Sequence, residues 1–101
     1  TCMDARIDPA QAFGLRPGEA HVMRNAGAIV TDDVLRSLAM AQQALGVRGV
    51  HVIAHTDCAA FGGDDDAAMA EAVDGAGRIE AVLPNLRARS GLLDLATGSV
   101  R

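Results

Sequence analysis

Aromatic side chains are almost absent from this chain of 101 residues, which has two Phe and neither Trp nor Tyr. Half of the residues are nevertheless hydrophobic, so a core must be built from Ala, Val, Leu, Ile and Met. Lys is also missing, and all nine positive charges belong to Arg. The net charge of −4 is unfavourable for binding nucleic acid or an anionic membrane surface, so neither is an expected partner.

Long hydrophobic runs are missing as well. The apolar stretches fall short of the roughly 20 residues that a membrane-spanning helix needs, and the sequence shows no signal peptide. We therefore expect a cytoplasmic protein. A chain of 101 residues can form one domain with a modest core. Because no linker or repeat divides it, residues 1–101 are expected to fold as a single domain.

Cysteine occurs only twice, at Cys2 and Cys58. A secreted domain of this size usually carries more than one disulfide, and two features near the cysteines serve no purpose in a disulfide. His55 lies three residues before Cys58, and Cys2 is followed by Asp4 and Arg6. Two thiolates and one imidazole suit zinc, which in catalytic sites keeps a fourth position open for water. The sequence therefore favours a zinc site of Cys2, His55 and Cys58, with a structural disulfide as the alternative.

Asp4 and Arg6 stand two residues apart, so on an extended backbone both side chains point to the same side. We expect Arg6 to hold the Asp4 carboxylate through a charge-assisted pair. Asp4 can then act as a hydrogen-bond acceptor beside the metal and offset the extra charge that two thiolates donate. Alternatively, Asp4 binds the zinc and closes the fourth position. We expect the closed form at lower pH, with activity rising through roughly pH 7–8.

The spacing Cys-x-Asp-x-Arg, followed later by His-x-x-Cys, resembles the signature of the β class of carbonic anhydrases. The likeness extends over residues 21–28 and 31–38, which look like the second strand, the loop and the following helix of that family. It is close from Thr1 to Cys58 and loose thereafter. The resemblance implies a carbonate dehydratase, which hydrates carbon dioxide reversibly to bicarbonate with a zinc-bound hydroxide. It also implies a homodimer or a larger assembly of identical chains.

The same resemblance implies an α/β fold, in which helices flank a parallel sheet with the strand order 2-1-3-4. Cys2 would then end a strand beside the one that ends at His55, where the strand order reverses and ligands gather. Compared with the family pattern, the chain is expected to lack the N-terminal helix and most of the first strand. Ala59 also replaces the Gly that usually follows the second Cys, and it would be strained if that position required a positive φ.

Other interpretations stay open. Relatives in the family hydrolyse carbonyl sulfide or carbon disulfide with the same ligand set. A permanent Asp4 ligand would instead make a non-catalytic, zinc-stabilised interaction domain, and a metal-free cysteine pair would make a redox dithiol. His21 and His51 could carry the product proton, although a partly exposed strand histidine is the commoner case. Asp57 is better suited to a turn, or to supporting the ligands, than to binding the metal.

Local patterns predict the secondary structure. Asp8-Pro9 indicates the start of a short helix that ends at Gly14. Apolar residues at spacings of three and four predict a helix over 32–45. Strands are expected at 20–24, 50–54 and 92–96, and two helical pieces at 67–73 and 78–86, separated by Gly75 and Gly77. Gly27 is expected to need a backbone conformation or a close approach that a side chain would forbid.

Overall fold

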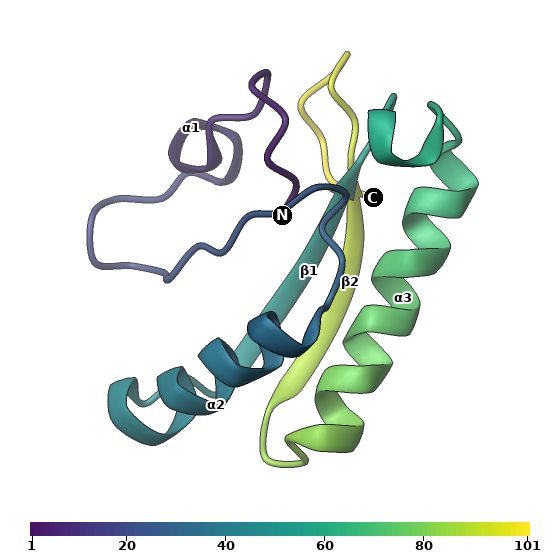
Figure 1. The fold of residues 1–101 in the computed structure, drawn as a ribbon. Helices are drawn as coiled ribbons and strands as arrows, with labels where there is room; N and C mark the ends of the chain where they lie inside the picture. Colours follow the sequence, from purple (N-terminus) through teal and green to yellow (C-terminus); the bar gives the residue numbers. More distant parts are fainter.

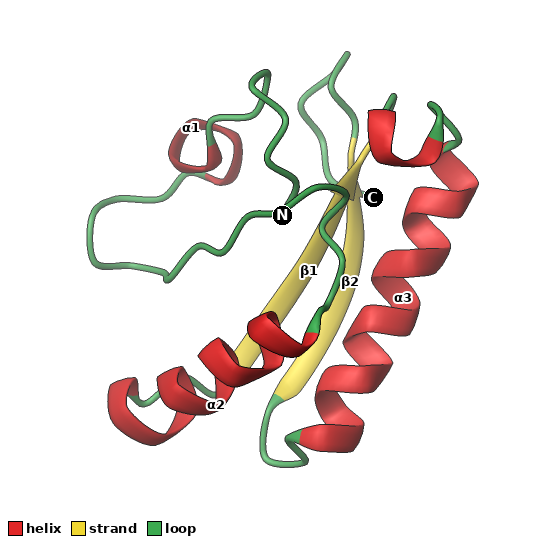
Figure 2. Ribbon diagram, viewed as in Figure 1, coloured by secondary structure: helices red, strands yellow, loops and turns green.

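The computed structural model describes every residue from Thr1 to Arg101. Figure 1 shows two strands side by side with helices flanking them, and Figure 2 distinguishes these elements from the loops. This is the expected α/β architecture, a parallel sheet with helices packed against it. The elements, in order, are α1 (Pro9–Phe13), α2 (Asp32–Leu45), β1 (Gly49–His55), the 3-10 turn η1 (Ala59–Phe61), α3 (Asp65–Val82) and β2 (Arg87–Leu93).

The paired strands β1 and β2 form a parallel ladder in which His55 lies opposite Leu93. A parallel pair needs a crossover connection, and α3 supplies it. Strand β1 was predicted over 50–54, and the structure confirms it with one further residue at each end. The last strand was predicted over 92–96, but β2 spans residues 87–93. Three of its first four residues, Arg87, Arg89 and Ser90, are polar, and these four positions alternate between exposed and half-buried. Only the buried end of the strand is therefore consistently apolar or small.

The first residues of the chain lie beside β1. Thr1 Oγ1 donates to the Ile53 carbonyl at 2.7 Å, and Cys2 forms a parallel bridge with Asn25. The segments therefore lie in the order 23–25, 1–2, β1 and β2, which is the order that the 2-1-3-4 pattern gives, although only β1 and β2 pair as strands. The predicted strand over 20–24 is wrong, because a strand needs a hydrogen-bonded neighbour. Residues 23–25 find one only in Thr1 to Met3, which supports a single bridge.

Helices α1 and α2 begin and end where their capping residues predicted. The Asp8 side chain accepts from the Ala10 N–H before α1, and Thr31 Oγ1 accepts from the Val34 N–H at 3.3 Å before α2. Gly14 and Gly46 follow the two helices with left-handed backbones, the common way for a helix to end. None of the helices is long and apolar enough to cross a membrane.

The two predicted helical pieces over 67–73 and 78–86 are one helix, α3, capped by Asp64. Gly75 and Gly77 do not interrupt it. Gly75 lies where α3 approaches Val30 so closely that a Cβ atom would come within 2.6 Å of Val30 Cγ2. Packing therefore overrides the low helix propensity of glycine at this position. Leu86 lies beyond the helix and is fully buried in the core.

The two glycines of α3 give a matched test of this packing. Gly75→Ala should lower the free energy of unfolding by about 1 kcal/mol or more, because overpacking outweighs the gain in helix propensity. Gly77→Ala meets no atom within 4 Å and should raise it by about 0.5–1 kcal/mol. Urea denaturation of both variants checks the prediction, and equal effects would refute the close approach of α3 to Val30.

The core is aliphatic, as the composition required, and it has two parts. The larger part lies between the strands and the helices α2 and α3, and includes Leu38, Val52, Ile79 and Leu92. The smaller part lies on the other face of the strands and consists of Cys2, Ile7, Ile53, Cys58 and Leu93. Both cysteines therefore belong to a packed, apolar cluster at the end of the sheet where β1 and β2 finish.

Candidate metal centre

Cys2, His55 and Cys58 come together from three separate places in the fold. Cys2 is fixed by its bridge to Asn25, His55 is the last residue of β1, and Cys58 directly precedes η1. All three are buried, and their ligand atoms lie within 4.8 Å of one another. The structure thus brings together the residues that the sequence singled out as zinc ligands, at the carboxyl end of β1.

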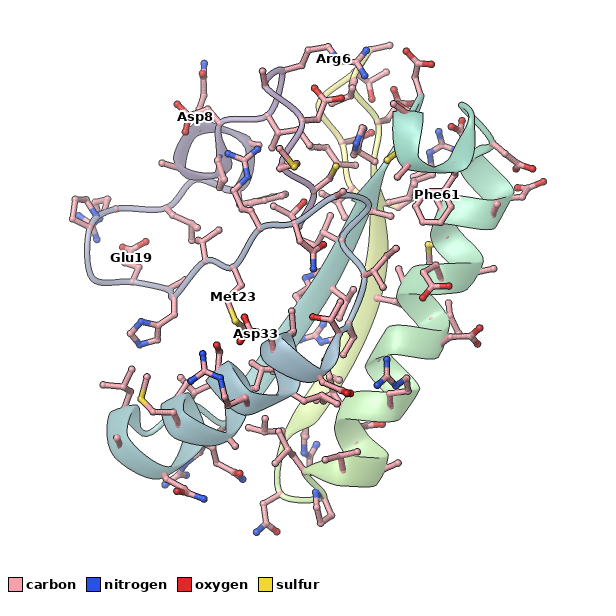
Figure 3. The ribbon with its side chains drawn as sticks, in the orientation of Figure 1. Arg6, Asp8, Glu19, Met23, Asp33 and Phe61 are labelled. Carbon is pink, nitrogen blue, oxygen red and sulfur yellow. The ribbon has the colours of Figure 1, made fainter.

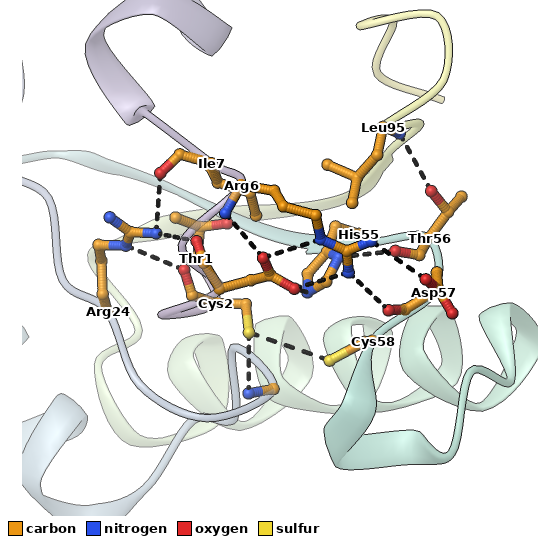
Figure 4. Close-up of polar contacts among 12 residues, drawn as sticks. Thr1, Cys2, Arg6, Ile7, Arg24, His55, Thr56, Asp57, Cys58 and Leu95 are labelled. Atoms are coloured by element: carbon orange, nitrogen blue, oxygen red, sulfur yellow. Dashed lines mark hydrogen bonds and ion pairs between the residues drawn. The ribbon is translucent and has the colours of Figure 1, made fainter.

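The two cysteines are free thiols, with their Sγ atoms 3.9 Å apart. This spacing is about twice the S–S bond length of a disulfide, so the chain contains no disulfide. Burial raises the pKa of the Cys58 thiol, and the backbone N–H of Ala60 opposes that rise. Figure 4 shows both sulfur atoms close to the His55 ring.

His55 has one ring nitrogen paired and one unpaired. Its Nδ1 lies 2.7 Å from the Thr56 carbonyl, which fixes Nδ1 as the donor because a carbonyl can only accept. In the neutral ring, Nε2 is then the nitrogen with the lone pair. It is buried and has no hydrogen-bond partner, alone among the buried side-chain nitrogen and oxygen atoms. A buried polar atom without a partner is costly, and a cation between Nε2 and the two sulfurs would remove that cost. The donor set fits zinc.

Asp4 and Arg6 form the pair that their spacing predicted. Arg6 Nε donates to Asp4 Oδ1 at 3.0 Å, and Nη2 donates to Asp4 Oδ2 at 2.8 Å. These hydrogen bonds hold the pKa of the Asp4 carboxyl well below its usual range. Asp4 Oδ2 also lies 3.8 Å from His55 Nε2. The carboxylate is therefore ionised, turned toward Arg6, and adjacent to the ligand group.

Arg6 also joins the two segments that carry the ligands (Figure 4). Its Nη1 donates to Asp57 Oδ2 at 3.1 Å, and its Nη2 donates to the Asp57 carbonyl at 3.0 Å. Asp57 has a positive φ of 54°, so the turn between His55 and Cys58 is tight. Asp57 therefore supports the turn and Arg6, which agrees with the supporting role expected for it.

Arg24 was not identified from the sequence, yet it organises the segment between Cys2 and Ile7. Its guanidinium donates to the carbonyls of Cys2, Asp4 and Ile7 at 2.9, 2.9 and 3.1 Å. These contacts fold the segment around one side chain, so that Cys2 points inward and Asp4 stays at its edge. Local sequence patterns do not predict these contacts, because Arg24 lies far along the chain from the carbonyls that accept its hydrogen bonds. His21 and His51 are exposed and do not belong to the ligand group.

The sequence model of the carbonic anhydrase family matches residues 1–94 of this chain. The chain belongs to the β-carbonic anhydrase family. The chain is 54% identical over 65 residues to β-carbonic anhydrase 1 of Mycobacterium tuberculosis, covering 64% of this chain and 40% of that protein. It is 48% identical over 67 residues to a carbon disulfide hydrolase of Saccharolobus solfataricus, covering 64% of this chain and 33% of that protein. The chain thus spans less than half the length of either curated relative.

The solved structures support the same family at the level of the whole fold. The carbonic anhydrase of Streptococcus mutans superposes with a TM-score of 0.84 and 32% identity, covering 99% of this chain and 76% of that one.

Ala59, which replaces the usual Gly after the second Cys, does not carry the backbone strain that a positive φ would cause. Positive φ values among residues other than glycine occur at Ala28 and Asp57, and Ala59 has none. Ala59 instead begins η1 without backbone strain.

Proposed function

We propose that this chain carries the zinc site of a carbonate dehydratase, which hydrates carbon dioxide reversibly to bicarbonate. Cys2 Sγ, His55 Nε2 and Cys58 Sγ are the proposed ligands. The observation that carries the proposal is the unpaired, buried Nε2 of His55, which lies among two thiols and beside an ionised carboxylate. The membership of this chain in the β-carbonic anhydrase family supports the same reaction.

Zinc held by three protein ligands supplies a bound water whose pKa falls from 15.7 to about 7, which gives a nucleophile at neutral pH. The residues of this chain do the positioning. Asp4, ionised and held on both oxygens by Arg6, offers an acceptor beside the ligand group. Because Arg6 holds both Asp4 oxygens, the carboxylate would leave the fourth position of a bound zinc to water. Asp4 as a metal ligand, the closed form expected at lower pH, remains a prediction.

Stopped-flow measurement of carbon dioxide hydration tests the proposal on the zinc-loaded protein. We expect saturable hydration well above the uncatalysed rate, and loss of nearly all of it in Cys58→Ser. Serine keeps the size of the side chain but replaces a thiolate by a hydroxyl that stays protonated at neutral pH. A zinc-loaded protein without activity would contradict the proposal, and so would a Cys58→Ser variant as active as the unmodified chain.

Carbon disulfide hydrolysis is the second candidate, because a relative named as a carbon disulfide hydrolase is 48% identical to this chain over 67 residues. Carbonyl sulfide is a related substrate of the same chemical class. All three molecules present a small electrophilic carbon, so the ligand group alone does not select among them. Release of hydrogen sulfide from carbon disulfide, measured on the same zinc-loaded preparation, distinguishes the candidates through the ratio of the two kcat/KM values.

A homodimer or larger assembly is also proposed. Met3, beside Cys2, is 63% exposed, and the apolar side chains of Val22, Met40 and Leu45 are exposed as well. A groove of about 640 Å³, lined mostly by apolar residues, runs between residues 13–23, α2 and β1. Covering this apolar surface favours association. Light scattering at micromolar concentration should report a dimer or a larger species, and a stable, folded monomer would contradict the proposal.

A further inference from the structure

The loop over residues 25–28 passes directly beside the Cys2 sulfur and is held rigidly. The Asn25 side chain spans it, with Nδ2 donating to the Ile29 carbonyl at 2.7 Å and Oδ1 accepting from the Ile29 N–H at 2.9 Å. The Asn25 carbonyl accepts from the Met3 N–H at 2.8 Å, which ties the loop to the segment that carries Cys2. The loop and the Cys2 sulfur are therefore fixed relative to each other.

Within this loop, the Gly27 N–H points at the metal site. Its nitrogen lies 3.4 Å from Cys2 Sγ, a buried N–H···S hydrogen bond. Gly27 has a φ of +85°, and a Cβ atom there would come within 3.0 Å of the Phe61 ring and 3.1 Å of Ala60 Cβ. Phe61, labelled in Figure 3, belongs to η1, and its ring lies against Gly27. The sequence indicated that Gly27 needs a special conformation or a close approach, and it has both.

We propose that Gly27 is a positioning residue of the zinc site, whose N–H accepts part of the charge of the Cys2 thiolate. A bare thiolate is a strong donor, and two of them reduce the positive charge that zinc can present to its water. A hydrogen bond to sulfur draws electron density away from the metal, and such outer-shell contacts tune metal sites generally. The backbone N–H of Ala60 acts on the Cys58 thiol in the same sense, because it opposes the rise in pKa that burial causes. Gly27 and η1, which contains Ala60, lie close together, since a Cβ atom at Gly27 would meet Ala60 and Phe61.

This inference rests on the proposed ligand set, but not on the reaction. Its first test is nuclear magnetic resonance of the chain loaded with cadmium-113. A hydrogen bond from an amide to a metal-bound sulfur transmits a scalar coupling from the metal to the amide proton. We expect a proton–cadmium cross-peak for the Gly27 amide beside those of the Cys2 and Cys58 β-protons. Cross-peaks from the β-protons without one from Gly27 would overturn the inference and leave the proposed metal site intact.

A matched pair of variants supplies the second test, read from the thiolate-to-cobalt charge-transfer band of the cobalt-loaded chain. In Gly27→Ala the added Cβ must push the loop away from Phe61 and lengthen the N–H···S contact. Loss of that contact raises the energy of the sulfur electrons, so the band should move to longer wavelength. Gly46→Ala introduces the same backbone strain at a φ of +72° with no atom within 4 Å, and should leave the band unchanged. Identical spectra for both variants would overturn the inference.

Discussion

Replacing His55 with asparagine should weaken zinc binding by more than about 100-fold, which exceeds the 10–100-fold loss usual for outer-shell partners of a metal. His55 supplies the nitrogen among the proposed ligands, and asparagine has no group that can place a comparable lone pair at the position of Nε2. Only the two cysteine sulfurs, 3.9 Å apart, would then remain of the three proposed protein ligands. Competition of the variant against a chromophoric chelator measures the change directly.

His51 provides the matched control, because it lies on the same strand four residues earlier. At the strand rise of about 3.3 Å per residue, it is about 13 Å from His55. His51→Asn removes an exposed imidazole and should leave zinc affinity unchanged. A His55→Asn variant that binds zinc as tightly as His51→Asn would show that the assignment of the nitrogen ligand is wrong.

Removal of Arg6 is expected to have the next largest effect. Arg6→Ala should lower the rate of carbon dioxide hydration by about 10–100-fold, the range typical of groups that orient a metal site. Arg6 donates to both oxygens of Asp4 and to Asp57, so its loss frees the carboxylate. The pKa of Asp4, which Arg6 depresses, would return toward its ordinary value near 4. Asp4 would therefore stay ionised at neutral pH and be able to turn toward the ligand group.

Arg36→Ala is the control for this experiment. Arg36 also donates two hydrogen bonds to an aspartate, Asp33. This pair lies on the exposed surface of α2, away from the ligand group. The control should leave hydration unchanged. Zinc content is measured on both variants, so that loss of metal is separated from loss of rate. Equal rates in the two variants would contradict the role assigned to Arg6.

That Cys2, His55 and Cys58 lie together could be predicted from sequence because the evidence is the chemical type and the spacing of these residues. Thiolates and an imidazole identify a metal site by type, and their spacing narrows the choice further. The supporting contacts could not be predicted in the same way. Arg24 binds three carbonyls of a segment some twenty residues away, and Asp57 meets Arg6 across the site. Such contacts depend on where the folded chain places each segment.

The fold shows a similar division. Helix α2 follows from its caps and its apolar spacing, which are properties of the helix itself. The sequence predicts two helices in place of α3, because glycine normally weakens a helix. In the structure Gly75 lies inside α3, where the close approach of Val30 leaves no room for a Cβ atom. The sequence places the last strand at 92–96 and not at the observed 87–93, because only the buried end of β2 is consistently apolar. In both cases a tertiary contact decides the structure, and the local pattern does not contain it.

X-ray absorption at the zinc edge, on protein reconstituted with zinc, tests the central claim most directly. We expect one zinc per chain with two sulfur neighbours at about 2.3 Å and one histidine nitrogen at about 2.0–2.1 Å. Less than half an equivalent of zinc after reconstitution, or a coordination sphere with fewer than two sulfurs, would contradict it.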